Sequence, residues 1–240
     1  IAIGKNALAT STTALSVVAI GDSAMGATAT GNTHTGTVAI GDSALANLTS
    51  GERNLAIGYQ SLQDLTDGDD NIMIGYQAGL DANSSGFLGN VGIGNYVFDG
   101  FGSTVTAAQN VAIGHQAMSG VLTSAADNNT VIGYQAALLM TGGDNNVIIG
   151  TNAADEILTG NNNVVIGKQA MHNADGAESE NTCVGSYAGD AIDGGSNNTI
   201  IGSTADPSGA TADNQIVIGK GATGQADNSV TLGNADVTAV

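Results

Sequence analysis

The chain has 240 residues and a formal net charge of −18, and it carries only four lysines and arginines in total. A surface that binds phosphates needs clustered cations, so this charge balance argues against a nucleic-acid partner and against an anionic membrane surface. No apolar run approaches the roughly 18 residues of a membrane span, so we expect no membrane insertion by this segment.

Residue composition favours thin, tightly stacked β-structure. The chain has 36 glycines, one proline, one cysteine and only 3% aromatic residues. Its apolar residues are mostly Ala, Val and Ile, which are small or β-branched and suit strands. The single cysteine rules out an internal disulfide framework.

Short predicted strands that end in glycine recur along the whole chain. The first ends at Gly4, and the others end at Gly21, Gly41, Gly58, Gly75, Gly94, Gly114, Gly133, Gly150, Gly167, Gly185, Gly202, Gly219 and Gly233. A period of 17 to 20 residues separates all but the last two, and this period is typical of one coil of a β-solenoid. We therefore predict an all-β fold, a parallel β-roll of about fourteen coils that forms a single repeat domain over 1–240.

Each position of the repeat has a physical interpretation. Ile stands directly before twelve of the fourteen glycines, and Asn recurs four positions before the glycine. The glycine is expected to take a positive φ where the chain turns, and the Asn side chains to stack as a hydrogen-bonded ladder. The remaining part of each unit varies in length and is rich in Gly, Asp, Asn, Ser and Thr, which predicts turns on one side of the coil.

Each predicted strand is apolar on both sides, and alternate residues of a strand point to opposite sides. We expect the Ile column before the glycine to point inward. The residue between the two flanking apolar positions would then point outward and form an interface between chains of a homotrimer. The candidate interface residues are Ala112, Val131, Ile148, Val165, Cys183, Ile200 and Val217.

The units "TVAIGDSALA" (37–46) and "NVAIGHQAM" (110–118) resemble the head repeats of trimeric autotransporter adhesins of the YadA type. The sequence "IGYQA" at 74–78 and 132–136 is similar to repeats of bacteriophage tail fibres. The resemblance implies a left-handed, homotrimeric parallel β-roll in an extracellular fibre, at a cell surface or on a virion. The family repeat is shorter, and only "NSVTLGNADV" (228–237) keeps its length. We expect a fragment of a longer fibre, with the last coil, 228–240, as a junction to a following domain.

Adhesion would require a contact surface outside the repeated columns. The irregular stretch 82–109 contains four of the scarce aromatics, Phe87, Tyr96, Phe98 and Phe101. Aromatic faces on loops suit a glycan or a surface protein of a host cell. These residues are therefore the candidate partner-binding site, and a tail-fibre spacer without a binding site of its own is the alternative.

Catalytic and metal-binding patterns are weak. "GDSA" at 21–24 and 41–44 lies within the repeat and has no accompanying histidine motif, and His34, His115 and His172 fall in different coils. We therefore expect no enzyme and no cofactor. Two alternatives stay open: a β-helical polysaccharide-degrading enzyme, and structural Ca²⁺ in the acidic turns. Those turns contain Asp64, Asp67, Asp69 and Asp70, or Asp190 and Asp193.

Overall fold

The computed structural model describes residues 1–9, 16–26, 34–83, 85–101 and 106–237. They divide into two compact units, Ile1–Asp127 and Asn128–Val240. In the described ranges the regular structure consists of short strands and turns, and none of it forms a helix that could cross a membrane. The predicted all-β parallel solenoid is confirmed, with about 17 residues between successive turns. The single domain over 1–240 stays a prediction.

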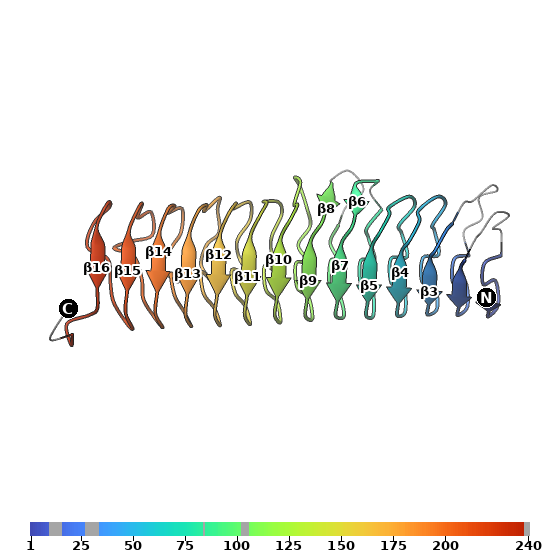
Figure 1. The fold of residues 1–240 in the computed structure, drawn as a ribbon, viewed down its shortest axis with the longest axis horizontal. Helices are drawn as coiled ribbons and strands as arrows, with labels where there is room; N and C mark the ends of the chain where they lie inside the picture. Colours follow the sequence, from blue (N-terminus) through green and yellow to red (C-terminus); the bar gives the residue numbers. More distant parts are fainter. Residues whose placement is uncertain (10–15, 27–33, 84, 102–105, 238–240) are drawn as a thin grey trace. The chain divides into compact units, whose positions relative to one another are not determined.

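The first unit contains one long parallel sheet and one small one (Figure 1). The long sheet runs in the order β1-β2-β3-β4-β5-β7-β9, and β6 pairs with β8. The strand bounds are β1 (Ala2–Ile3), β2 (Val18–Ile20), β3 (Val38–Ile40), β4 (Leu55–Ile57), β5 (Ile72–Ile74), β6 (Phe87–Leu88), β7 (Val91–Ile93), β8 (Ala107–Ala108) and β9 (Val111–Ile113).

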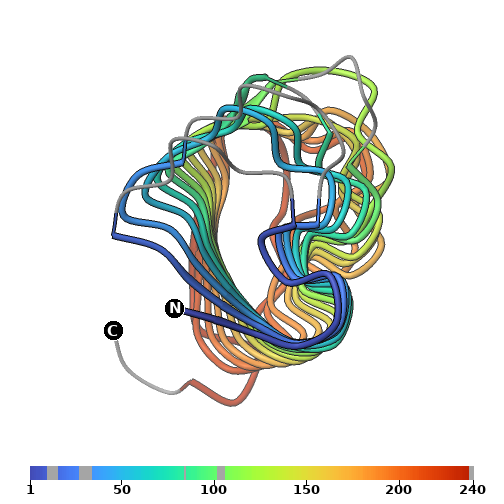
Figure 2. The ribbon, with the colours of Figure 1, turned by 90° about the vertical axis from the view of Figure 1, so that its right-hand side faces the viewer.

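The second unit repeats the same coil. Its strands pair in parallel in the order β10 to β16, each with the next along the chain. They are β10 (Thr130–Ile132), β11 (Val147–Ile149), β12 (Val164–Ile166), β13 (Thr182–Val184), β14 (Thr199–Ile201), β15 (Ile216–Ile218) and β16 (Val230–Leu232). Figure 2 shows that in each unit the chain returns to the strand side once per turn, while the opposite side follows a more variable path.

Successive strands pair in register, so that equivalent residues of the repeat form straight columns. In β11 and β12, for example, Ile148 pairs with Val165 and Ile149 pairs with Ile166. Every full-length strand of three residues from β2 to β15 has a buried middle residue between two partly exposed or exposed ones. The interior is completed by buried Ala, Met, Leu and Ile side chains from the turns.

The glycine after each strand is required by two constraints at once. Gly150 has a φ of +146°, and a Cβ atom placed there would lie 2.2 Å from the backbone oxygen of Gly167. Any side chain would therefore collide with the next coil and strain the backbone. Two and four residues after the glycine of β12, Gln169 and Met171 also have positive φ, 52° and 49°. The predicted positive-φ turn is confirmed.

The predicted asparagine ladder is also confirmed. The Oδ1 atom of Asn129 accepts hydrogen bonds from the backbone N–H and the side-chain Nδ2 of Asn146, at 2.9 and 3.0 Å. Asn146 Nδ2 also donates to the backbone oxygen of Gly160 at 2.8 Å, and Asn163 repeats the pattern on Asn146. All of these side chains are buried. The ladder therefore satisfies polar groups that would otherwise be costly inside the coil.

Replacing Asn71 by Ala in the first unit should lower the free energy of unfolding by about 1–3 kcal/mol. The variant leaves the buried backbone N–H and Nδ2 of Asn90, which donate to Asn71 Oδ1 at 3.0 and 3.2 Å, without that acceptor. Urea unfolding followed by circular dichroism measures the loss. The matched control is Asn83→Ala, at an exposed loop position, where we expect a change within about 0.5 kcal/mol. Equal costs for the two variants would contradict a stabilising ladder.

Candidate functional site

The residues predicted at the trimer interface lie inside the coil. Ala112, Val131, Ile148, Val165, Cys183, Ile200 and Val217 all have 0% of their surface exposed in the single chain. They cannot contact another chain, so this prediction was wrong. Both columns of each strand are apolar, so hydrophobicity does not tell which column points inward. The sheet places the middle residue of each three-residue strand in the interior. Burial also raises the pKa of the Cys183 thiol, in keeping with its role as a small core residue.

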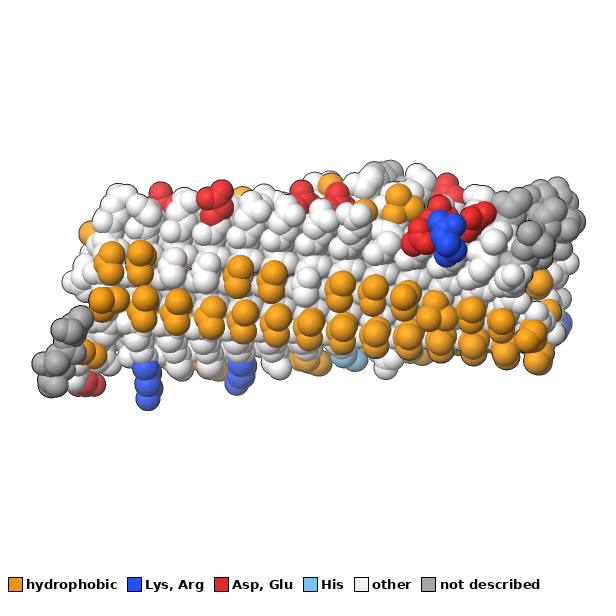
Figure 3. Space-filling model, viewed as in Figure 1, with side chains coloured by type: hydrophobic (Ala, Val, Ile, Leu, Met, Phe, Trp, Pro, Cys, Tyr) orange, Lys and Arg blue, Asp and Glu red, His pale blue; other side chains and the backbone are white. Residues whose placement is uncertain are grey.

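The flanking columns, expected inside, form an exposed apolar surface instead. We call the outer side of the strands the sheet face. Ile166, Ile201 and Ile218 expose 36, 38 and 39% of their surface there. Figure 3 shows one unbroken row of hydrophobic side chains over the strands and a second, interrupted row beside it. The interruptions are threonines, at Thr130, Thr182 and Thr199. The described strand residues include no charged side chain. Exposed apolar surfaces of this kind are typical of interaction sites.

Three of the four candidate partner-binding aromatics are core residues. Phe87, Phe98 and Phe101 are 1, 0 and 2% exposed, and their ring centroids lie 5.0 to 5.9 Å apart in edge-to-face contacts. They fill the part of the coil where β6 and β8 form the additional small sheet. The aromatics and the irregular length of this stretch predict a recognition loop, but the three phenylalanines pack against one another in the interior of the longer turn. The prediction was wrong for these three residues.

Tyr96, the fourth candidate, lies partly exposed in a row of aromatic rings that sequence reasoning missed. Tyr59 and Tyr76 stack at 5.2 Å, Tyr76 contacts Tyr96 at 5.3 Å, and Tyr96 contacts His115 at 5.7 Å. Tyr59 and Tyr76 are 44 and 40% exposed. The signal was present in the sequence, since Tyr59, Tyr76 and His115 each directly follow a strand-ending glycine.

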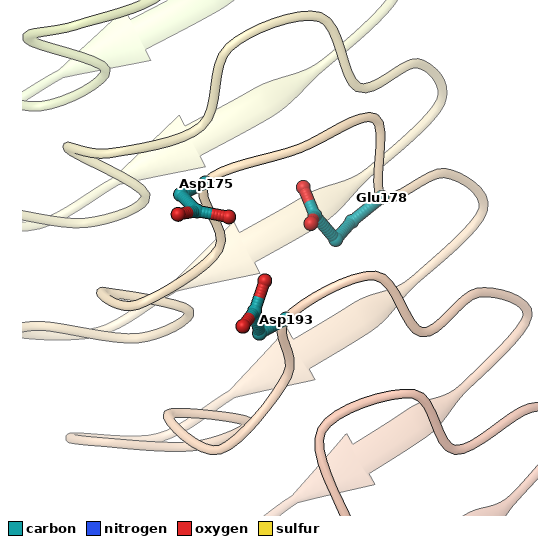
Figure 4. A group of neighbouring side chains, drawn as sticks. All are labelled: Asp175, Glu178 and Asp193. Atoms are coloured by element: carbon teal, nitrogen blue, oxygen red, sulfur yellow. The ribbon is translucent and has the colours of Figure 1, made fainter.

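The acidic turns bring three carboxyl groups together in the second unit. Asp175, Glu178 and Asp193 have oxygen atoms within 4.8 Å of one another, and Figure 4 shows them in neighbouring turns. Glu178 is buried, and its Oε1 accepts hydrogen bonds from the backbone N–H groups of Gly176 and Gly194 at 3.0 and 2.8 Å. A hydrogen bond with Asp175 raises the pKa of Asp193. Ca²⁺ takes six to eight oxygens, so these three groups alone fall short of a complete site.

The other acidic turn holds coils together through its side chains. Arg53 donates to both carboxylate oxygens of Asp70, at 2.6 and 3.0 Å, and the Asp69 carboxylate accepts the Glu52 backbone N–H at 2.7 Å. Asp64 accepts from the Asn47 side chain at 2.9 Å. These bonds link residues of successive coils. Structural Ca²⁺ in these turns stays an alternative to the expectation of no cofactor.

The three histidines lie in different coils, and one of them, His172, forms a hydrogen-bonded pair with the buried carboxylate of Asp155. His172 Nδ1 lies 2.5 Å from Asp155 Oδ1, while Asp155 Oδ2 accepts from Asn152 at 2.9 Å. The hydrogen bond with Asp155 raises the pKa of His172, and partial burial opposes this change. The pair therefore links two neighbouring coils most strongly when His172 is protonated.

The His172–Asp155 pair should make the second unit more stable at mildly acidic than at alkaline pH. Because the folded-state pKa of His172 is raised, its contribution is complete below the ordinary histidine pKa, about 6.5. The contribution is lost as the pH rises through the raised pKa. We expect the stability difference between the wild type and His172→Gln to shrink between about pH 6 and pH 9, measured by urea unfolding. A pH-independent difference would contradict this role, and the exposed His115→Gln is the control for loss of a histidine.

Comparison with protein-family models, with curated proteins and with solved structures gives no match to this chain. The resemblance to adhesin heads and tail-fibre repeats therefore rests on the repeated motif alone. Of what the resemblance implies, the parallel solenoid is shown by the structure. The trimer, its handedness and its role stay expectations.

Proposed function

We propose that this chain is a self-associating structural segment of an extracellular fibre, with the homotrimer as its assembly. The observation that carries the proposal is the sheet face, an apolar surface without charged residues that runs over successive coils of each unit. Such a surface is costly to leave in water. Covering it with other copies of the chain would remove that cost and build a stiff, multivalent fibre element.

A second copy of the chain suits this surface better than an unrelated partner does. The outward Ile column presents one apolar side chain per coil, and in-register pairing keeps these side chains at a constant repeat. Another copy has the same repeat, so its side chains can interdigitate at every level of the face. A globular partner with irregular spacing would match only a few levels. The trimer rather than another cyclic assembly follows from the resemblance to adhesin heads.

The spacer role is favoured over direct adhesion for the described residues. Three of the candidates for contact with a glycan or surface protein, Phe87, Phe98 and Phe101, are buried in the core. No pocket is present among the described residues. We therefore propose a non-catalytic segment that spaces and holds the fibre at a cell surface or on a virion. Among the former candidates, only Tyr96 remains on the surface.

Two neighbouring substitutions in β12 separate assembly from folding. Ile166 is 36% exposed on the sheet face, whereas Val165 is fully buried in the coil. Ile166→Asp should give a folded monomer, because a carboxylate on the face would be unpaired in the interface. Val165→Asp should lower the free energy of unfolding by several kcal/mol, because the carboxylate is buried within the chain.

Sedimentation velocity and circular dichroism measure the two effects. The proposal requires that the wild type assembles and that Ile166→Asp dissociates with an unchanged spectrum. A wild type that is monomeric at micromolar concentration would overturn it. Ile166→Ser, which changes the apolar contact without adding a charge, should weaken assembly less than Ile166→Asp does.

A further inference from the structure

The exposed aromatic row of the first unit contains two kinds of tyrosine pair. Tyr59 and Tyr76 each directly follow a strand-ending glycine in successive coils, so both rings leave the chain at the same position of the repeat. Their ring planes differ by 15° and their centroids lie 5.2 Å apart, so the two rings stack face to face. Tyr76 contacts Tyr96 differently, because the planes of those two rings lie at 64° to each other.

Coil stacking fixes the backbone beneath the parallel pair. The strands that precede the two tyrosines pair in register, with Ile57 opposite Ile74. After the tyrosines, the backbone N–H of Gln77 donates to the carbonyl oxygen of Tyr59 at 2.9 Å, and the Gln77 side chain donates to that of Gln60 at 2.7 Å. The fold therefore holds the two phenol rings together and leaves their side-chain torsions as the main freedom.

The same two phenols are accessible to an oxidant in solution. Tyr59 and Tyr76 expose 44 and 40% of their surface, and the chain has no tryptophan. Oxidation of sulfur-containing side chains depends on their exposure. All of those side chains are buried, namely Cys183, Met25, Met73, Met118, Met140 and Met171. Exposed tyrosines are therefore better placed than any sulfur atom of this chain to react at the surface.

We propose that Tyr59 and Tyr76 are a modification site, at which a haem peroxidase with hydrogen peroxide forms a dityrosine cross-link between two successive coils. A link between residues one repeat apart restricts the unfolded chain, so it would stabilise the coils that it joins. The proposal does not rest on self-association, because both tyrosines belong to the same chain.

The coupling balances with hydrogen peroxide as the oxidant. Each phenol loses one electron and one proton and becomes a tyrosyl radical, whose unpaired electron is shared by the oxygen and the two Cε atoms. The two radicals form one Cε–Cε bond, and the hydrogen on each bonded Cε then moves to the phenolic oxygen, which restores both phenols. The peroxide accepts the two electrons and the two protons and becomes two water molecules.

Ring orientation favours coupling within the parallel pair. The radical orbital projects perpendicular to the ring plane, so the orbitals of Tyr59 and Tyr76 point toward each other. In the edge-to-face pair, the orbital of one ring points at the C–H bonds of the other, which gives poor overlap. Small rotations of exposed side chains are fast and bring the Cε atoms of stacked rings together. Groups held in position in this way react faster than groups that meet by diffusion.

Treatment of the full chain with a haem peroxidase and hydrogen peroxide tests the proposal. Cleavage before each aspartate places the five tyrosines in separate peptides, with Tyr59 in 42–63 and Tyr76 in 70–80. In material that runs as a single chain on a denaturing gel, mass spectrometry should find these two peptides joined and two hydrogens lighter than their sum. Tyr59→Phe and Tyr76→Phe should each lower dityrosine fluorescence about tenfold. The matched control is Tyr134→Phe, at an exposed tyrosine that also follows a strand-ending glycine, and it should leave the fluorescence unchanged.

A gain of coupling tests the role of the repeat position. Thr151 is exposed and directly follows Gly150, one repeat after Tyr134. Thr151→Tyr should therefore create a second stacked pair, detected as a joined pair of peptides 127–143 and 144–154.

Three outcomes would overturn the proposal. The first is that the tyrosines are oxidised without joining the two peptides that contain Tyr59 and Tyr76. The second is that these peptides join only in bands of two or more chains. The third is that Thr151→Tyr yields no second cross-link although its circular dichroism spectrum matches that of the wild type. Sedimentation velocity measures the oligomeric state separately, so each of these outcomes leaves the proposed self-association in place.

Discussion

Close in-register stacking of one coil on the next is the constraint on which the rest of this structure depends. At the end of each strand the backbones of adjacent coils approach so closely that only glycine fits, as at Gly150 against Gly167. Parallel strand pairing and the asparagine ladder then repeat the same contacts at each level. A single coil has too little interior to be stable alone, so its stability comes from its neighbours. The near-identity of the strand units is the consequence.

Stacking also determines what each side chain can do. Because equivalent residues of successive coils lie above one another, the same residue type at one position of the repeat forms a column over several coils. The side chains of a buried column must be small, or their shapes must fit the side chains of the coils above and below. At Gly92, for instance, the missing side chain leaves room for Met73 and Phe98, whose atoms lie within 3 Å of where a Cβ would stand. An exposed column becomes a continuous surface, and a modest Ile side chain repeated in register produces the apolar sheet face.

Polar and charged residues on the outside of the coil also contact their counterparts in the neighbouring coils. Several acids that look like potential metal ligands in the sequence are bonded between coils, such as Asp70 to Arg53 and Asp64 to Asn47. In the second unit, acids stand before several strands and Lys168 and Lys220 stand after two of them.

The sequence by itself determined the solenoid, its parallel strands, the glycine turns and the asparagine ladder. Each of these follows from a periodic pattern in which one residue type has one physical use. Only the tertiary structure decided which of two apolar columns faces inward, because Val165 and Ile166 are equally hydrophobic neighbours and a strand can present either side. It also decided that Phe87, Phe98 and Phe101 form a core, since a longer turn can either protrude into solvent or fold back over its own interior. Neither choice leaves a mark in local composition, because burial depends on how the whole coil closes.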